Sequence, residues 1–259
     1  MTNIGYAQHP EIRLNQVRMN TSETQLRREI CDIGRRMHTA GLVAGTDGNI
    51  SARLGNNRFL ITPSGSCLGL MEPRDLAVIN SKGEALPGSS KPSSERWMHL
   101  CAYERRPDIQ AAIHAHPPTT IALTLAGVAF DPCALPEVII AFGRVPVTAY
   151  ATPATEEGAV VIREWISRYD ALALDRHGSL TVGKTLYDAL FKLEKLEHGA
   201  HVIFMAHQLG RVKSLPPEEI SKLASLREHF GLGRADDISP QCLPPGTVSP
   251  RITRGPDSY

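Results

Sequence analysis

The sequence predicts a layered α/β fold, because helix and strand signals alternate along its 259 residues. Short apolar runs bounded by glycine and asparagine turns indicate strands and hairpins, and longer stretches with a helical apolar stripe indicate amphipathic helices. Apolar residues form 42% of the chain and charged residues 21%, which suits a substantial core rather than disorder. This length suits one large domain or two small ones.

The first expected helix begins near Ser22, where a capping serine is followed at once by the acidic Glu23. Gly41 is well placed to end it. Its apolar face would consist of Leu26, Ile30, Ile33 and Met37. Residues 1–20, which precede this helix, are expected to form a loose N-terminal arm.

A hairpin and a second helix are expected next. Residues 49–54 and 58–62 have strand-like composition and flank Gly55-Asn56-Asn57, a typical hairpin turn. Residues 77–79 repeat the pattern as a further short strand, and a helix is expected over residues 93–106, starting at Ser93.

The second half of the chain is expected to alternate strands and helices. The expected strands cover residues 109–116, 145–150 and 171–176. The expected helices run from the prolines at 117 and 118 to Leu125, over about 155–168, and over about 184–209.

Residues 232–259 contain many prolines, glycines and serines, and they cannot form a regular helix or a central strand. We expect an irregular C-terminal tail there. The predicted organisation is therefore an arm at 1–20, a domain at 21–231 and a tail at 232–259.

The balance of charged residues limits the classes of partner that the protein is expected to bind. Its 28 basic and 27 acidic residues give a net charge of +1, which provides no electrostatic footprint for nucleic acid or an anionic membrane. No apolar run approaches the roughly 20 residues that span a bilayer, and the N-terminus lacks the apolar middle of a signal peptide. We therefore expect a cytoplasmic protein. The scattered cysteines are expected to be reduced thiols without disulfides: Cys31, Cys67, Cys101, Cys133 and Cys242.

His114 and His116 are the first candidates for chemistry. Residues two apart in a strand project from the same face, so two imidazoles can reach one metal ion, although the pair could equally be ordinary polar residues. His177, at the end of an apolar strand, would be a third ligand, or else a capping or surface residue. Three imidazoles with an open position are typical of catalytic zinc. The histidines in predicted helices are expected to have no such role: His38, His99, His198, His201 and His207.

The run Lys91-Pro92-Ser93-Ser94-Glu95 indicates a helix start. Free N–H groups and two hydroxyls at such an end could bind an anion, and Glu95 beside them could be a metal ligand, a base or both. A capped helix with an acid in its first turn is the plainer interpretation. The turns at 45–51 and 62–65 could add donors to an anion cradle, although such clusters are usually turns only.

Taken in order, the motifs GNxS, ITPSG, KPSSE, HxH and HG followed by a GxxLxxA helix resemble the class II aldolase and adducin family. The resemblance covers about residues 22–210. It implies a central, mostly antiparallel sheet between helical layers, and a homotetramer with active sites at subunit interfaces. It also implies a divalent metal, most readily Zn²⁺, with Mn²⁺, Co²⁺ or Fe²⁺ as alternatives.

The resemblance assigns roles to particular residues. The metal ligands would be His114, His116 and His177, and Glu95 would be the catalytic acid that also touches the metal when no substrate is bound. The phosphate-binding motif would consist of Gly48, Asn49, Ser64, Gly65, Ser93 and Ser94.

Two further positions are compared with tyrosines of the family. Fuculose-phosphate aldolases have a tyrosine, acting from the neighbouring subunit, near the position of Glu137. Glu137 is expected to be either a different proton donor or a structural residue before a strand. Tyr150 matches a tyrosine that is common in the family but has no certain role.

The activity implied is that of a metal-dependent carbon–carbon lyase. It would cleave a ketose 1-phosphate to dihydroxyacetone phosphate and an aldehyde through a metal-stabilised enediolate. The alternatives are a decarboxylase of a hydroxylated aromatic or 3-oxo acid, a sugar-phosphate epimerase or dehydratase, and a non-catalytic adducin-like module. The complete set of ligand and cradle residues favours an enzyme with a phosphorylated sugar substrate over the adducin-like module.

Overall fold

The computed structural model describes residues 22–55, 57–128, 130, 133–233, 237–238 and 242. The expected arm at 1–20 and most of the expected tail at 232–259 lie outside these residues, so the proposed division into arm, domain and tail stays a prediction. None of the helices within the described ranges has the length and apolar character needed to cross a membrane.

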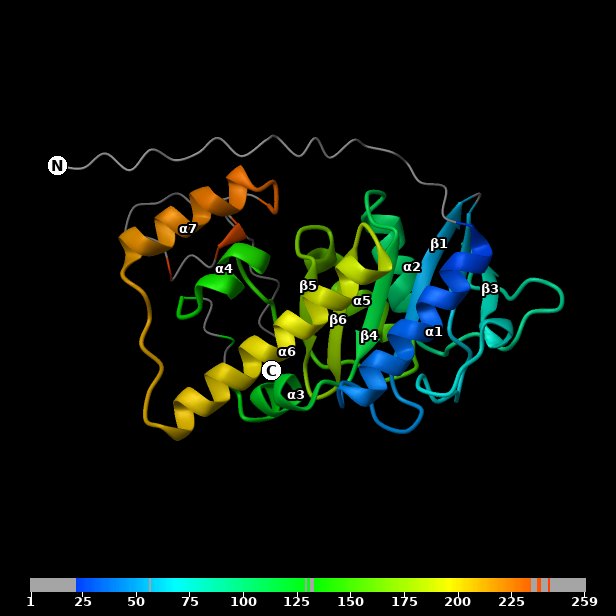
Figure 1. The fold of residues 1–259 in the computed structure, drawn as a ribbon, viewed down its shortest axis with the longest axis horizontal. Helices are drawn as coiled ribbons and strands as arrows, with labels where there is room; N and C mark the ends of the chain where they lie inside the picture. Colours follow the sequence, from blue (N-terminus) through cyan, green and yellow to red (C-terminus); the bar gives the residue numbers. More distant parts are fainter. Residues whose placement is uncertain are drawn as a thin grey trace, which may run out of the picture.

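A six-stranded sheet forms the centre of the fold, in the order β3-β2-β1-β4-β6-β5 (Figure 1). Each neighbouring pair of strands is antiparallel, which confirms the sheet that the family resemblance implied. The strands are β1 (Asn49–Gly55), β2 (Arg58–Ile61), β3 (Ala77–Asn80), β4 (Ala111–Ala115), β5 (Ala171–Leu174) and β6 (Gly178–Gly183).

Helices cover both faces of this sheet, so the layered α/β prediction is confirmed. One apolar cluster packs α1 and α6 against β1 and β4, and another packs α2 and α5 against the opposite face. Helix α4 packs against α7 and also contacts α6, and α4 and α7 lie beyond the β5 edge of the sheet (Figure 1). The helices are α1 (Glu23–Thr39), the 3₁₀ helix η1 (Pro73–Asp75), α2 (Arg96–Arg105), α3 (Pro118–Leu125), α4 (Pro136–Phe142), α5 (Glu157–Ile166), α6 (Leu186–Gln208) and α7 (Pro217–His229).

The alternation of side chains along β4 positions the candidate ligands. Ile113 is fully buried in the cluster of α1 and α6, whereas Ala112 is buried in the cluster of α2 and α5. Because successive strand residues point to opposite faces, His114 lies on the same face as Ala112, beneath α2. His114 is fully buried there.

In the first half of the chain, two predicted elements are confirmed and the start of a third differs from the prediction. The helix near Ser22 is confirmed, with Ser22 as its N-cap, and the hairpin between β1 and β2 is confirmed as well. The helix expected from Ser93 begins three residues later, at Arg96. Ser93 instead donates its backbone N–H to Thr62, which keeps the segment beside a neighbouring turn and leaves Glu95 at the N-cap.

In the second half of the chain, the observed elements differ more from the prediction. The strand expected at 145–150 is reduced to one bridge between Val147 and Ala173, because Pro146 has no N–H with which to extend a ladder. Strand β6 was not predicted, since its terminal glycines resemble turn residues, and helix α7 was also missed. Residues 136–142 form a helix rather than the approach to a strand, so Glu137 lies in the first turn of α4.

The prediction of five reduced cysteines is wrong for one pair. Cys133 and Cys242 form a disulfide, whereas Cys31, Cys67 and Cys101 are free. The pair is 109 positions apart, and it is brought together by an apolar cluster that joins α4 and α7. Sequence spacing could not show this proximity, because it depends on how these two helices pack.

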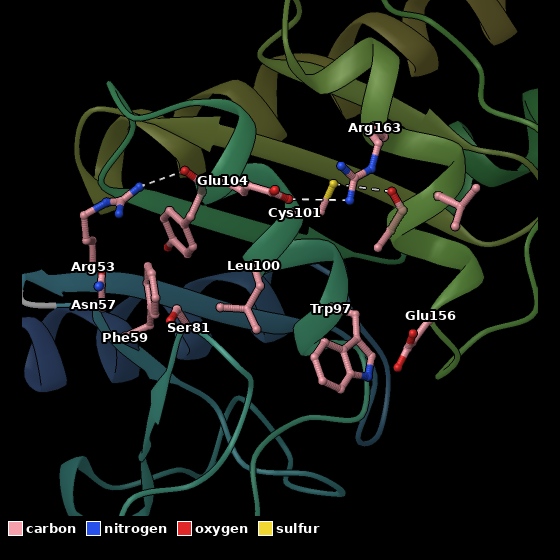
Figure 2. Close-up of a pocket in the computed structure, with 13 residues that line it drawn as sticks. Arg53, Asn57, Phe59, Ser81, Trp97, Leu100, Cys101, Glu104, Glu156 and Arg163 are labelled. Atoms are coloured by element: carbon pink, nitrogen blue, oxygen red, sulfur yellow. Dashed lines mark hydrogen bonds and ion pairs between the residues drawn. The ribbon is translucent and has the colours of Figure 1, made fainter.

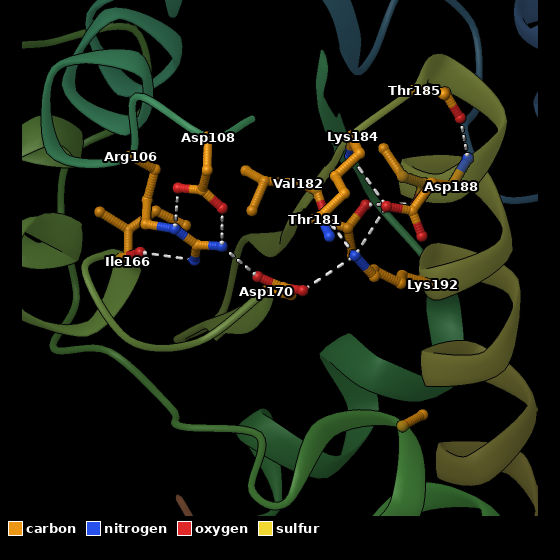
Figure 3. Close-up of polar contacts among 12 residues, drawn as sticks. Arg106, Asp108, Ile166, Asp170, Thr181, Val182, Lys184, Thr185, Asp188 and Lys192 are labelled. Atoms are coloured by element: carbon orange, nitrogen blue, oxygen red, sulfur yellow. Dashed lines mark hydrogen bonds and ion pairs between the residues drawn. The ribbon is translucent and has the colours of Figure 1, made fainter. Parts of the chain in front are cut away.

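A charged network ties α6 to the sheet (Figure 3). Arg106, which follows α2, lies 2.8 Å from both Asp108 and Asp170. Lys192 of α6 lies 2.8 Å from Asp170 and 3.0 Å from Asp188. These residues precede β4 and β5 or follow β6, so the network lies at the end of the strands opposite to His114.

Candidate metal centre

Four predicted site residues meet at one end of the sheet. Single ligand atoms of Glu95, His114, His116 and His177 all lie within 4.8 Å of one another. His114 and His116 come from the end of β4, His177 from the turn between β5 and β6, and Glu95 from the residue before α2. The ring centroids of the three histidines are 4.7, 4.8 and 4.9 Å apart.

The tight turn before β6 brings His177 to this cluster. Arg176 has a φ of +56°, and the backbone N–H of His177 donates to the carbonyl of Leu174. A Cβ atom on Gly178 would lie 2.2 Å from the carbonyl oxygen of Ala115. Only glycine therefore allows β6 to start so close to β4, and this approach places the third imidazole beside the other two.

The Nε2 atoms of the histidines face the centre of the cluster. His114 Nε2 lies 3.0 Å from His116 Nε2 and 3.1 Å from Glu95 Oε2, and His177 Nε2 lies 3.3 Å from Glu95 Oε1. His114 Nδ1–H donates to the carbonyl of Ser179 over 2.9 Å, because a carbonyl can only accept. This hydrogen bond fixes the ring so that Nε2 of His114 points toward the cluster.

The carboxylate of Asp47 is the partner of the His116 ring nitrogen that faces away from the cluster. Asp47 Oδ2 lies 3.3 Å from Nδ1 of His116, on the side away from the cluster. Metal-binding histidines commonly have a carboxylate or a carbonyl as the partner of the outer nitrogen, which fixes the ring orientation and the tautomer. Asp47 and the Ser179 carbonyl occupy these positions for His116 and His114.

The ionisation states also suit a cation. Burial opposes ionisation of Glu95, but the charges and hydrogen bonds of His114 and His177 outweigh it and hold the pKa of this carboxyl well below its usual range. Burial, with the neighbouring His114 and His177, lowers the pKa of His116 to about 4. At neutral pH the cluster therefore offers a carboxylate and a neutral imidazole, which are the forms that bind metals.

The turns expected to form an anion cradle are adjacent to one another. The N–H of Ser93 donates to Thr62, and the N–H of Ser64 donates to Lys91, which joins the turn at 62–65 to the segment at 91–94. The N–H of Thr62 donates to Ile50 in β1, one residue after Asn49. The three segments that carry the predicted phosphate-binding residues thus meet beside Glu95.

Two of these side chains already have partners within the protein. The amide nitrogen of Asn49 donates to Glu95 Oε2 over 2.9 Å, and the amide oxygen lies 2.5 Å from Nε2 of His99. The hydroxyl of Ser93 accepts the backbone N–H of Glu95 over 3.2 Å. Both residues position Glu95, whereas Ser64 and Gly65 are exposed and Ser94 is half-buried.

A close approach of the backbone explains the glycine at 48. Gly48 has a φ of +76°, and a Cβ atom there would lie 2.7 Å from Val43 and 2.9 Å from the carbonyl of His114. Any other residue would push the turn away from β4. Gly65 has a similar φ of +73° but has open space around it, so only its conformation favours glycine.

Glu137 and Tyr150 do not belong to the cluster of four. Glu137 is exposed on α4, which packs against α6 and α7. Tyr150 is 57% exposed and comes just before residues 151–155, which border a small cleft together with Glu95 and His177. Their predicted roles remain untested by the contacts within one chain.

A larger cavity of about 600 Å³ lies elsewhere, between α2 and α5 (Figure 2). Its walls include Phe59, Trp97 and Leu100, and Glu104 lies 3.5 Å from Arg163 across it. None of the four cluster residues lines this cavity. We therefore place the candidate chemistry at the histidines and not in this larger space.

A family model described as the class II aldolase and adducin N-terminal domain matches residues 28–204. The chain belongs to the class II aldolase and adducin family. The match spans the strands and turns that carry the histidines, Glu95 and the adjacent serines, so it confirms the resemblance drawn from the motifs.

Individual relatives of this family member are enzymes with phosphorylated substrates in their names. A 3-oxo-tetronate 4-phosphate decarboxylase of Pectobacterium atrosepticum is 33% identical over 211 residues, which are 79% of this chain and 94% of the relative. A 5-deoxy-D-ribulose 1-phosphate aldolase of Bacillus thuringiensis is 34% identical over 210 residues, 79% of this chain and 96% of the relative. The solved structure of an L-fuculose 1-phosphate aldolase has a TM-score of 0.73 at 30% identity, covering 82% of this chain and 99% of that one.

Sequence reasoning missed the residues that support the ligands. Asp47 lies in the glycine-rich turn that the sequence predicts as a source of amide and hydroxyl donors, and His99 is among the helical histidines that it predicts to have no role in the site. The spacing of four residues between Glu95 and His99 was an available signal, because such residues share a helix face. The contribution of Ser179 is a backbone carbonyl, for which a sequence carries no signal.

Proposed function

We propose that this protein is a metal-dependent carbon–carbon lyase that acts on a small phosphorylated keto sugar. The observation that carries the proposal is the meeting of three imidazoles and one carboxylate beside a set of serine and glycine turns. The family membership and the named activities of the relatives support it.

The donor set fits a divalent cation. His114, His116 and His177 would hold the ion, with Glu95 as a further ligand when no substrate is bound. Imidazole nitrogen with one carboxylate suits Zn²⁺ best, and Mn²⁺, Co²⁺ or Fe²⁺ are also compatible. A bound ion would supply Lewis acidity that stabilises negative charge on substrate oxygens next to the breaking bond.

The chain's own residues would bind and orient the substrate and move a proton. Glu95 is the carboxyl placed to transfer a proton at the reacting carbon, as general acid or base. Gly48, Ser64, Gly65 and Ser94 would hold the phosphate, which orients the reacting bond through a remote group. Asn49 and Ser93, proposed for the same cradle, would contribute mainly by holding Glu95.

Aldol cleavage is the first candidate reaction, with dihydroxyacetone phosphate and an aldehyde as products. Metal-loaded protein should release dihydroxyacetone phosphate from at least one of a panel of ketose 1-phosphates, measured with a coupled dehydrogenase. Metal-free protein and Glu95→Gln provide the controls, and both should be inactive. Absence of product from every ketose 1-phosphate would reject the aldolase proposal.

Decarboxylation is a second candidate, favoured by the relative named as a 3-oxo-tetronate 4-phosphate decarboxylase. Loss of carbon dioxide from a 3-oxo acid also leaves negative charge beside a carbonyl, and that carbon also needs one proton. The same protein preparation should be tested for carbon dioxide release from 3-oxo acids with and without a phosphate. Release without any retro-aldol product would assign the activity to decarboxylation.

The assembly and location are also proposals. A homotetramer with sites at subunit interfaces would give a mass in solution four times the 28.3 kDa of the chain, which light scattering can measure. In such a tetramer the exposed Glu137 is proposed as a proton donor to a neighbouring site. We also propose a cytoplasmic location, which cell fractionation would test.

A further inference from the structure

We propose that His99 is a positioning residue for Glu95 and acts through the amide of Asn49. The inference rests on the proposed lyase function, in which Glu95 transfers a proton. It assigns a role to a buried histidine that is neither one of the proposed metal ligands nor one of the proposed phosphate-binding residues.

A continuous row of side chains carries the inference. Ser51 Oγ lies 2.8 Å from the hydroxyl of Tyr103 and 2.6 Å from Nδ1 of His99. His99 Nε2 lies 2.5 Å from the oxygen of Asn49, whose nitrogen lies 2.9 Å from Glu95 Oε2. The row therefore links two turns of α2 to the start of β1 and ends at the carboxyl group.

The row is closed to water. The exposed fractions are 3% for Asn49, 0% for Ser51, 1% for His99 and 3% for Tyr103. Buried polar groups are costly unless each donor meets an acceptor. The hydrogen bonds in this row are consequently strongly constrained in direction.

Chemistry fixes that direction from the carboxylate outward. A carboxylate can only accept, so the amide nitrogen of Asn49 faces Glu95 and its oxygen faces His99. Nε2 of His99 must then carry the proton, and Nδ1 of a neutral ring must accept from the hydroxyl of Ser51. The hydroxyl of Tyr103 in turn donates to Ser51, so every hydrogen bond donates toward Glu95.

Burial is consistent with this neutral ring. Burial, with the nearby charge of His114, lowers the pKa of His99 to about 3. A neutral imidazole has one donor and one acceptor, which is the combination that the row requires. Hydrogen bonds aligned in one direction also strengthen one another, so Asn49 is a better donor to Glu95 than an isolated amide.

The consequence for the site is a fixed carboxyl orientation. Asn49 holds Oε2, while the backbone N–H of Glu95 is held by Ser93. Oε1 remains directed to His177, at 3.3 Å. If the amide of Asn49 turned over, its oxygen would face the carboxylate, and His99 prevents this by donating to that oxygen.

Steady-state kinetics would test the role in catalysis. In His99→Leu, metal content should stay at the wild-type level and KM should change less than about twofold, while kcat should fall about tenfold or more, as for other outer-sphere partners. His99→Gln keeps a donor that can reach Asn49, so it should recover most of kcat. The exposed His207→Leu serves as the matched control and should leave all three quantities unchanged. Equal losses in His99→Gln and His99→Leu, or an unchanged kcat in His99→Leu, would overturn the proposal.

A measurement on the wild-type protein keeps the proposal testable even if His99 variants do not fold or the lyase proposal fails. Nitrogen NMR of histidine-labelled protein should show His99 as the Nε2–H tautomer, with its resonances assigned by their absence in His99→Gln or by through-bond experiments. An Nδ1–H tautomer or a charged ring at neutral pH would contradict the positioning role. This readout does not depend on turnover, so it separates failure of this inference from failure of the proposed function.

Discussion

The amide nitrogen of Asn49 lies 2.9 Å from Oε2 of Glu95, although the two residues are 46 positions apart in the chain. One begins the central strand β1 and the other caps α2, so this contact joins the sheet to the helix that covers it. The carboxyl of Glu95 is therefore oriented by the fold itself. Positioning by rigid elements favours a preorganised site.

Loss of one imidazole should abolish metal retention. His116 is a better test than His114, because its side chain is 22% exposed whereas His114 is fully buried, so its truncation disturbs the core less. We expect His116→Ala to lose most of its metal after dialysis, measured by elemental analysis, while its thermal unfolding stays close to that of the metal-free wild-type protein. The exposed His207→Ala should retain the metal, and full metal content in His116→Ala would contradict the ligand assignment.

Much of the fold could be predicted because it depends on local patterns. The hairpin of β1 and β2 follows from a glycine and asparagine turn between apolar runs, and α1 follows from Ser22 and its apolar stripe. Strand β6 was missed because Gly178 and Gly183 look like turn residues. Gly178 is required by the 2.2 Å approach to the carbonyl of Ala115, which only the folded chain reveals.

The candidate site also has features that the sequence predicts and features that only the packing determines. Spacing alone made His114 and His116 a pair, while His177 and Glu95 entered through the order of the motifs. The side-chain direction of Asn49 could not be predicted, because it depends on His99 one layer away in α2. Sequence therefore indicated which residue types gather at the site, and packing decides which of them hold the others in place.

Crowding at Gly48 should be separable from its backbone conformation. Gly48→Ala meets Val43 and the carbonyl of His114, whereas Gly65→Ala has a similar positive φ and open space. We expect Gly65→Ala to lower the free energy of unfolding by about 1 kcal/mol and Gly48→Ala by about 3 kcal/mol. Urea denaturation monitored by circular dichroism would measure both, and equal losses would show that the crowding is relieved by movement of the turn.

The charged network at the opposite end of the sheet should contribute to stability without affecting the site. Asp170 accepts from Arg106 and Lys192, which are only 16% and 19% exposed. We expect Asp170→Asn to lower the free energy of unfolding by about 1–3 kcal/mol, because two largely buried cations lose their shared partner. Glu104→Gln disrupts a more exposed ion pair with Arg163. This variant should change the free energy of unfolding by no more than about 0.5 kcal/mol. Metal content should be the same in both variants, and a loss of metal in Asp170→Asn would contradict the separation of network and site.

The disulfide between Cys133 and Cys242 should be detectable in the purified protein. Alkylation of the denatured, unreduced chain should label three of the five cysteines, Cys31, Cys67 and Cys101, whereas prior reduction should allow all five to react. The bridge closes a loop across 109 positions, and in the chain-entropy model such a loop adds about 5 kcal/mol to stability. Cys242→Ser should therefore unfold at lower denaturant than wild type under oxidising conditions, and the difference should shrink when reductant is present. Labelling of all five cysteines without reduction would show that Cys133 and Cys242 remain thiols in the isolated protein.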